Sequence, residues 1–256
     1  MTTEPQLRIE GVSKRYANGK AVLENFSLDI QNEEFVAFIG PRGCGKSTIL
    51  RLIAGLTPIT SGQIQHAGGG DINQRTSYIF QESALLPWRN VESNVGLPLR
   101  LRGLKAAAIS ERIRDVLKLW DINHVSNRFP LQLTPGMKVR TSLARGLITQ
   151  PRTLLLDEPF AALDAIARNK LSADLMKVRQ KRHFTACLVT HSAAEAVFLA
   201  NRVVVLAANP GRIAEIIDVP ESYPRKLEWR ETDAFQEAVN QVRNALSRVQ
   251  EDAKKA

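Results

Sequence analysis

The sequence predicts an α/β fold, in which a mainly parallel sheet is covered by helices and interrupted by an inserted helical lobe. Short, uninterrupted apolar runs recur at 35–39, 153–156, 186–189 and 203–206. Runs of this length are typical of strands buried on both faces, as in a parallel sheet covered by helices. Helical patterns lie between these runs, including residues 46–54, where Gly55 provides a stop signal. This alternation indicates an α/β architecture.

The middle of the chain differs from its flanks, because residues 91–146 have mostly helical patterning and no strong strand. Within 106–120 the apolar residues fall on one helical face, as expected of an amphipathic helix. These residues are Ile109, Ile113, Val116, Leu117 and Trp120. We therefore expect a helical subdomain at about 91–146, inserted into a domain that spans residues 1–230.

Residues 231–256 predict a C-terminal helical tail. Its apolar positions recur at four-three spacing, at Phe235, Val239, Val242, Leu246 and Val249. A stripe of this kind usually docks on the core of its own chain, and we favour that interpretation. A dimer or partner contact is the alternative.

Composition limits the class of protein. The chain has 256 residues, 44% of them hydrophobic, which fits one large domain or one domain with an inserted lobe. No apolar run approaches the roughly 18 uncharged residues of a membrane helix, and the amino terminus lacks a signal-peptide pattern. Cys44 and Cys187 are too few for a disulfide framework and are expected to be reduced thiols. We therefore expect a soluble, cytoplasmic protein.

The chain is basic, with a net charge of +9 and a sequence pI of about 9.8. Such a balance is compatible with a nucleic-acid partner or with a position near an anionic membrane surface. The charge is dispersed along the chain, so it favours neither partner, and a solvated surface is the simplest interpretation.

One segment has the sequence of a phosphate-binding loop, G-x-x-x-x-G-K-[ST], between an apolar run and a helical pattern. It consists of Gly40, Pro41, Arg42, Gly43, Cys44, Gly45, Lys46 and Ser47. Glycines let backbone N–H groups curl around phosphate oxygens, and the following helix adds its dipole. Lys46 is predicted to reach the β- and γ-phosphates, and the Ser47 hydroxyl to bind Mg²⁺.

Two carboxylates follow the apolar run at 153–156. At the end of a buried strand, Asp157 can hold Mg²⁺, and Glu158 can orient or deprotonate an attacking water. A surface acidic pair is the alternative, but the phosphate loop favours the functional interpretation. His191 follows another apolar run and can bind a γ-phosphate or catalytic water, although a lone histidine is more often structural. No G-x-S-x-G elbow and no zinc-ligand spacing is present in the sequence.

Together these motifs resemble those of ABC-transporter ATPases over residues 7–220, nearly the whole chain. The resemblance implies a P-loop NTPase core whose mainly parallel sheet is joined by N-terminal antiparallel strands. It implies that Tyr16 stacks on adenine and that Thr48 belongs to the ATP-binding segment. Gln81, between Phe80 and Glu82, would contact Mg²⁺ or water and sense a membrane subunit.

Two further segments match the family in order. Residues 157–164 read Asp-Glu-Pro-Phe-Ala-Ala-Leu-Asp and are similar to the family's D-loop, with Asp164 at the end. Thr190-His191 is similar to the switch histidine. The resemblance assigns the catalytic roles to Glu158 and His191, and the Mg²⁺ ligands to Ser47, Gln81 and Asp157.

The resemblance also implies a mechanism and partners. Two such subunits, the same or different chains, clamp ATP and Mg²⁺ between one subunit's phosphate loop and the other's signature motif. Closure moves transmembrane permease subunits, which puts this chain at the cytoplasmic face of the inner membrane as a peripheral protein. A solute-binding protein is an indirect partner, and no nucleic acid is expected. Segments 85–91 and 209–213 are similar to those of importers for taurine, alkanesulfonates and nitrate, so a small anion is the expected cargo.

The signature motif departs from the family's Leu-Ser-Gly-Gly pattern. Here Leu133 is followed by Thr134, Pro135, Gly136 and Met137. Thr134 is predicted to cap a helix and Pro135 to be its first residue, so the helix forms but offers one fewer N–H to a partner's γ-phosphate. Ser192 is a second departure, because the family usually has Asp after the switch histidine.

Three matters stay open at the level of sequence. The altered signature allows a degenerate subunit that binds ATP while a second, different subunit hydrolyses it. The basic charge allows a nucleic-acid-associated ABC ATPase, although such proteins carry two cassettes or a long coiled-coil insertion, and this chain has neither. Leu85, Leu86 and Trp88 form an apolar cluster that either contacts a membrane subunit or fills the seam between the lobes.

Overall fold

The computed structural model describes residues 4–16, 19 and 21–255. Its larger sheet has six strands in the order β5-β6-β7-β3-β8-β9, all parallel except β9, which is antiparallel to β8. The strands are β3 (Phe35–Ile39), β5 (Thr76–Ile79), β6 (Thr153–Asp157), β7 (Thr185–Val189), β8 (Arg202–Ala207) and β9 (Arg212–Asp218). The four predicted apolar runs lie in β3, β6, β7 and β8, so the mainly parallel sheet is confirmed.

The smaller sheet is antiparallel and has the order β2-β1-β4. It consists of β1 (Leu7–Arg15), β2 (Ala21–Ile30) and β4 (Ser61–His66), which confirms the expected N-terminal antiparallel strands. Its apolar side chains share a core with those of helix α1 (Lys46–Ile53) and with Val36 and Phe38 of β3. Phe35, Ala37 and Ile39 of β3 point into the second core on the other face. Because strand side chains alternate, one buried strand serves two cores.

Helix α1 begins at Lys46, within the phosphate-loop motif, and ends at Ile53, with Ala54 as its cap. Gly55 adopts a φ of 68°, which glycine tolerates without a Cβ clash. The Gly55 N–H donates to Leu52 O at 3.0 Å, and the Leu56 N–H donates to Arg51 O at 2.9 Å. These two bonds form a Schellman motif, so Gly55 ends the helix as predicted.

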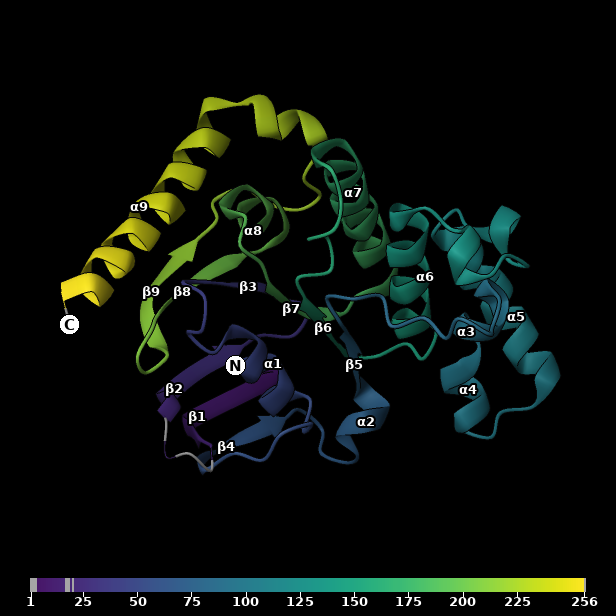
Figure 1. Cartoon of the computed structure of the whole chain (residues 1–256), viewed down its shortest axis with the longest axis horizontal. Coiled ribbons are helices and arrows are strands. Elements are labelled where there is room, and N and C mark those ends of the chain that lie inside the picture. The colour runs from purple at the N-terminus through teal and green to yellow at the C-terminus, as the bar shows by residue number, and fades with distance from the viewer. Residues whose placement is uncertain (1–3, 17–18, 20, 256) are drawn as a thin grey trace.

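Residues 91–147 form a helical lobe that projects from one end of the larger sheet (Figure 1). It contains α3 (Val91–Val95), α4 (Leu97–Leu101), α5 (Ala106–Leu119), the 3₁₀ turns η1 (Asn123–Val125) and η2 (Pro130–Gln132), and α6 (Pro135–Leu147). The predicted face of α5 is buried, and Trp120 is fully buried after it. α6 returns the chain to the sheet, where a Cβ on Gly146 would lie 2.5 Å from the Ile79 side chain of β5.

Helices α7 (Ala165–Arg182), α8 (Ala193–Leu199) and α9 (Asp233–Lys255), the short helix α2 (Ile72–Arg75) and the 3₁₀ turn η3 (Leu227–Glu231) complete the fold. The apolar stripe of α9 packs on α8 and β8, and its members Phe235, Val239, Val242 and Val249 are buried. The tail therefore docks on its own chain. Within the described part of the chain, no helix has the length and apolar character needed to cross a membrane.

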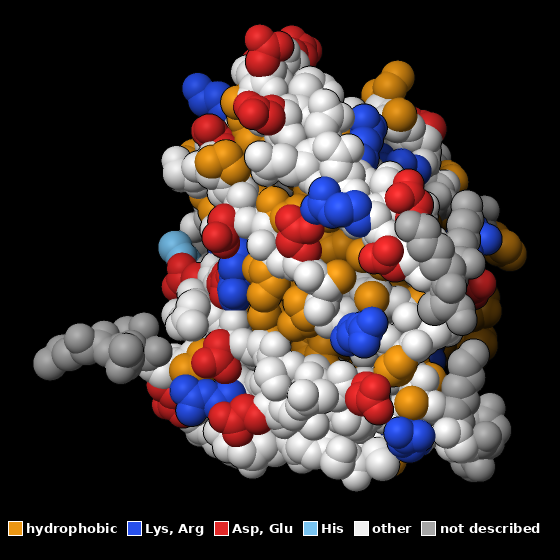
Figure 2. Space-filling view, turned by 90° about the vertical axis from the view of Figure 1, so that its left-hand side faces the viewer, with side chains coloured by type: hydrophobic (Ala, Val, Ile, Leu, Met, Phe, Trp, Pro, Cys, Tyr) orange, Lys and Arg blue, Asp and Glu red, His pale blue; other side chains and the backbone are white. Residues whose placement is uncertain are grey.

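Figure 2 shows the side of the molecule on which the carboxyl-terminal end of α9 lies. Lysines and arginines are interspersed there with acidic side chains around an apolar centre. The net positive charge is therefore not gathered into one patch on this face.

Candidate nucleotide-binding site

The loop between β3 and α1 has a backbone that requires glycine at three positions. A Cβ on Gly40 would lie 2.7 Å from Leu206 O, and Gly43 and Gly45 adopt φ values of 79° and 95°. Gly45 is also the N-cap of α1 and offers no side-chain hydrogen bond to it. The first N–H groups of α1 are thus left without a side-chain cap, as in a helix start that binds an anion.

Lys46 lies folded over this loop with only 6% of its surface exposed. Its Nζ donates to Gly40 O at 2.9 Å and to Pro41 O at 2.8 Å. Cys44 is buried below it, and burial raises the pKa of the thiol. Cys187 is also buried and free, so both cysteines are thiols in the structure.

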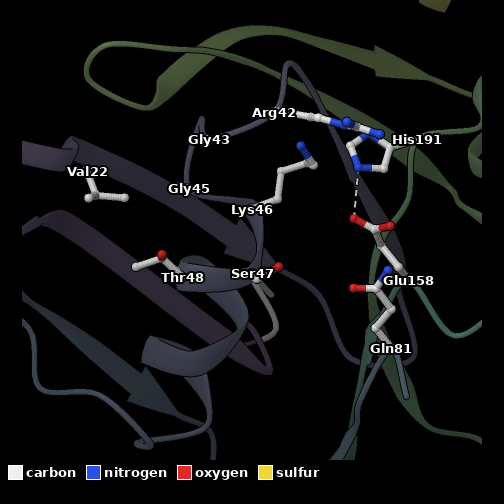
Figure 3. Close-up of a pocket in the computed structure, with 10 residues that line it drawn as sticks. All are labelled: Val22, Arg42, Gly43, Gly45, Lys46, Ser47, Thr48, Gln81, Glu158 and His191. Atoms are coloured by element: carbon white, nitrogen blue, oxygen red, sulfur yellow. Dashed lines mark ion pairs between the residues drawn. The ribbon is translucent and has the colours of Figure 1, made fainter. Parts of the chain in front are cut away.

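A pocket of about 430 Å³ opens above the loop (Figure 3). It lies at the carboxyl ends of parallel strands, the edge at which open α/β sheets bind ligands. Gln81 comes from the end of β5, Glu158 from the end of β6 and His191 from the end of β7. The lining residues are Val22, Arg42, Gly43, Gly45, Lys46, Ser47, Thr48, Gln81, Glu158 and His191. The structure thus brings most of the predicted ATP-binding residues into one cavity.

Asp157 is held by two hydroxyl groups. Ser47 Oγ donates to Asp157 Oδ1 at 2.7 Å, and Tyr78 OH donates to Asp157 Oδ2 at 2.7 Å. Burial, followed by the bond to Asp157, raises the pKa of Tyr78, so this phenol stays a donor at neutral pH. Tyr78 is absent from the sequence prediction, because its role depends on β5 lying beside β6, a neighbour relation that no local pattern encodes.

The donor set here fits Mg²⁺. The ion prefers oxygen ligands and binds through one or two protein groups together with phosphate oxygens and water. Ser47 and Asp157 supply such oxygens 2.7 Å apart, and the Gln81 side chain lines the same pocket. Within the described residues, no group of three or more His, Cys, Asp or Glu side chains is arranged so that it could hold a metal ion.

Glu158 and His191 form a pair at the far wall of the pocket. His191 Nε2 lies 2.8 Å from Glu158 Oε1, drawn as the dashed line in Figure 3. Glu158 adopts a left-handed φ of 48°, and its N–H donates to Val189 O at 3.0 Å. The Glu158 side chain is 17% exposed and the His191 side chain 44%, and both line the pocket. This arrangement places a proton acceptor where a water could approach a bound phosphate.

Several predicted residues lie outside this pocket. Tyr16 follows β1, is 42% exposed and has Lys14 Nζ 5.1 Å from its ring centroid. Asp164 caps α7 by accepting from the Ala167 N–H at 2.9 Å. Neither is among the lining residues.

The altered signature segment is also separate from the pocket. Thr134 caps α6 as predicted, since its hydroxyl accepts from the Met137 N–H at 3.3 Å, and Pro135 is the first residue of the helix. Thr134 and Pro135 are exposed, and a Cβ on Gly136 would meet no atom within 4 Å. This chain's own pocket is thus lined without the segment.

The loop after Gln81 is tied to the helical lobe. Arg145 of α6 donates through Nη1 to Ala84 O and through Nη2 to Ser83 O, both at 2.8 Å. Leu85 packs partly buried against the main core, whereas Trp88 is 71% exposed. The predicted apolar cluster is therefore divided, with Leu85 in the seam and Trp88 on the surface.

The loop that contains Gly211 packs against the phosphate loop. A Cβ on Gly211 would lie 2.1 Å from Cys44 O, so only glycine fits this approach. The Gly211 N–H donates to Val22 O at 2.9 Å, and the Glu24 N–H donates to Gly211 O at 3.1 Å. Segment 209–213, noted in the sequence only for its resemblance, thus packs against the backbone of the phosphate loop and of β2.

Comparison with known proteins agrees with this geometry. Residues 23–161 match the ABC transporter family. The chain is 42% identical to an aliphatic sulfonates import ATP-binding protein of Mesorhizobium japonicum, over 88% of this chain and 86% of that protein. It is 41% identical to a taurine import ATP-binding protein of Escherichia coli O157:H7, over 84% of this chain and 86% of that one.

A solved structure is also similar. It is a dimeric post-hydrolysis state of an ATP-binding cassette bound to ADP and Pi, with 26% identity and a TM-score of 0.73. The match covers 84% of this chain and all of that one. A family match over more than half of the chain, together with relatives above 40% identity over most of it, shows that this chain belongs to the ABC transporter family.

Proposed function

We propose that this chain is the ATP-binding and ATP-hydrolysing subunit of an ABC importer for a small anionic solute. The observation that carries the proposal is the single pocket that unites the phosphate loop with Gln81, Glu158 and His191 at one edge of the sheet. The sulfonate and taurine import proteins among the relatives support the importer branch. The cargo is then a sulfonate, taurine or nitrate-type anion.

The residues of the pocket take complementary roles in this function. Lys46, the loop N–H groups and Thr48 bind the phosphates of ATP, and Tyr16 stacks on the adenine. Ser47, Asp157 and Gln81 would hold Mg²⁺, which would neutralise charge on the β- and γ-phosphates. Glu158 accepts a proton from the attacking water, and His191 holds Glu158 and the γ-phosphate in register. Tyr78 keeps Asp157 in place through its hydrogen bond.

The exposed signature segment supports a two-subunit arrangement. Thr134 and Gly136 face the ATP of a second ATPase subunit, whose own signature faces the pocket of this chain. Asp164 lies on the same shared boundary. The similar solved structure is dimeric, which supports this arrangement. Closure around ATP and release after hydrolysis then provide the working stroke.

Transmembrane permease subunits receive this stroke, and a solute-binding protein delivers the cargo to them. The exposed Trp88, beside the loop that follows Gln81, is a contact point for a permease. The chain is thus peripheral, at the cytoplasmic face of the inner membrane. A degenerate subunit is not favoured, because Lys46, Asp157 and Glu158 are all present and the relatives are import ATP-binding proteins.

Reconstitution tests the proposal. The chain is purified with the membrane subunits that copurify with it and placed in liposomes together with the solute-binding protein of the same system, and uptake of labelled taurine, an alkanesulfonate and nitrate is measured with Mg-ATP. We expect ATP-dependent uptake of one of these anions, and no uptake with Lys46→Ala. ATP hydrolysis no higher than that of Lys46→Ala would contradict the enzymatic proposal. Active hydrolysis without uptake of any of the three anions would contradict only the assignment of cargo.

A further inference from the structure

A buried carboxylate lies behind the Glu158–His191 pair. Glu195 of α8 is 5% exposed. With Glu158 and His191 it lines a second cavity of about 250 Å³, next to the nucleotide pocket. The other residues that line this cavity are Ala161, Arg168, Thr190 and Ser192. The chemistry proposed above makes no use of Glu195, yet burying a carboxylate is costly unless it has partners.

Glu195 is connected to the loop that carries His191. The Ser192 N–H donates to Thr190 Oγ1 at 3.0 Å, and the Glu195 N–H donates to Ser192 Oγ at 3.3 Å. The Thr190 and Glu195 side chains line the same cavity, and interaction with the Thr190 hydroxyl lowers the pKa of the Glu195 carboxyl. Residues 190, 192 and 195 are thus connected on both sides of His191. These contacts restrict the backbone from which the imidazole reaches Glu158.

Charges on three other elements face the Glu195 carboxylate. Burial raises its pKa to about 7, while Arg168 of α7 and Arg230 of η3 lower the pKa and the carboxylate of Glu158 raises it. Among the described side chains, the Nε atoms of Arg168 and Arg230 are buried without a hydrogen-bond partner. Arg168 also donates through Nη2 to Leu163 O at 2.8 Å, next to Asp164. Glu195 therefore lies between the His191 loop and the start of α7.

We propose that Glu195 is a positioning residue for ATP hydrolysis, which holds the His191 loop in place through Thr190 and attracts Arg168 at the start of α7. The inference rests on the proposed ATPase function and adds a residue to it. Glu195 lines the second cavity and not the nucleotide pocket, so we assign it an action through His191 and Glu158. The link to Leu163 extends this effect to the segment before Asp164.

Steady-state ATPase kinetics of the assembled complex test the inference. Glu195→Gln keeps the volume but removes the charge, so we expect kcat to fall about tenfold while KM for ATP changes less than about twofold. Thr190→Val removes the hydroxyl link and should have the same effect. Thr190→Ser keeps the hydroxyl and should restore kcat to within about twofold of the wild type. Combining Glu195→Gln with Thr190→Val should cost less than the sum of the two single losses, because both changes act on the contact between residues 190 and 195.

A pH profile separates this role from a general structural one. In the wild type, kcat should rise as Glu195 ionises near neutral pH, and in Glu195→Gln this rise should be absent. Glu237→Gln, an exposed carboxylate on α9, is the matched control and should leave both kcat and the profile unchanged. Melting curves establish that each variant is folded, and if Glu195→Gln is not, the Thr190 pair decides.

Three results would overturn the inference. The first is a Glu195→Gln enzyme with wild-type kcat and an unchanged pH profile. The second is an equal loss in Thr190→Ser and Thr190→Val, and the third is a proportional change of kcat and KM with no change of profile. In each case wild type and Glu237→Gln still hydrolyse Mg-ATP above the level of Lys46→Ala. If they do not, it is the ATPase proposal that fails.

Discussion

The phosphate pocket and the signature segment 134–137 are both built at the start of a helix, but only the pocket finds its partners within the chain. Lys46 is bonded to two loop carbonyls, Asp157 to two hydroxyls and Glu158 to His191. Among the described residues, the Thr134 hydroxyl bonds to its own helix alone, and the space beside Gly136 is open. Folding of this chain therefore organises the pocket, whereas the proposed role of the signature segment depends on a second molecule.

Loss of the Glu158 charge should lower kcat more than any other change, because it removes the proposed proton acceptor from the phosphate pocket. In Glu158→Gln we expect ATP binding to be kept and kcat to fall roughly 10²- to 10⁴-fold. ATP should then accumulate with the two subunits closed, which light scattering after gel filtration would detect. Turnover close to the wild type in the assembled complex would remove Glu158 from this role.

A buried carboxyl beside the phosphate pocket, Glu195, makes the stability of the fold depend on pH. Because its folded-state pKa is raised from 4.5 to about 7, Glu195 contributes stability below pH 4.5 that is lost as the pH rises through 7. The free energy of unfolding of the wild type, relative to Glu195→Gln, should therefore fall by roughly 3 kcal/mol between pH 4.5 and 8. Urea unfolding at several pH values measures this difference. If this difference in the free energy of unfolding does not change with pH, the pKa of Glu195 is not raised, as expected of a carboxyl that water reaches.

Removal of the Lys46 amine tests the cation that the phosphate loop holds through two carbonyl groups. A charge-assisted hydrogen bond is worth about 1.5–3 kcal/mol, so Lys46→Ala should lower ATP affinity or turnover at least about tenfold. Equilibrium binding of a fluorescent ATP analogue and the ATPase rate measure the two quantities. Wild-type values for both would show that the phosphate site has been misassigned. Lys177→Ala, on the exposed side of α7, is a suitable control.

The smallest change in turnover is expected at the signature segment, where Pro135 lacks an N–H that would contact the ATP of a partner subunit. Reverting Thr134-Pro135 to Ser-Gly restores one N–H, which should raise turnover about fivefold at the affected site. If the reverted complex has unchanged ATPase activity and ATP affinity, Pro135 is a neutral variation. An increase confined to one of two sites would instead indicate pairing with a different ATPase subunit.

Much of the fold could be predicted from the sequence because its signals are local. The run at 35–39 coincides with β3, and the phosphate-loop pattern predicts the glycines whose backbone the structure shows to be restricted. Lys46, Asp157 and His191 each lie at or just beyond the end of a predicted apolar run, and in the structure these runs are the neighbouring strands β3, β6 and β7.

The residues of the site that the sequence does not predict owe their roles to packing between elements that lie far apart in the chain. Tyr78 reaches Asp157 only because β5 pairs with β6. Glu195 reads as an ordinary acidic residue in the first turn of a helix, and its burial depends on α7 and η3 closing over it. Gly211 lies far along the chain from Cys44 and is restricted only by contact with that carbonyl. Such constraints arise from topology, which no local periodicity records.

Helix α6 connects the signature segment 134–137 to the loop that follows Gln81, a residue of the phosphate pocket. It begins at Pro135, beside the exposed Thr134, and near its other end Arg145 grips the carbonyls of Ser83 and Ala84. A helix of 13 residues is a stiff rod of about 20 Å. If α6 tilts as one body, its bonds to Ser83 and Ala84 shift the loop that follows Gln81 with it. Helix α6 is therefore a direct, stiff connection between the exposed segment 134–137 and the loop that follows Gln81.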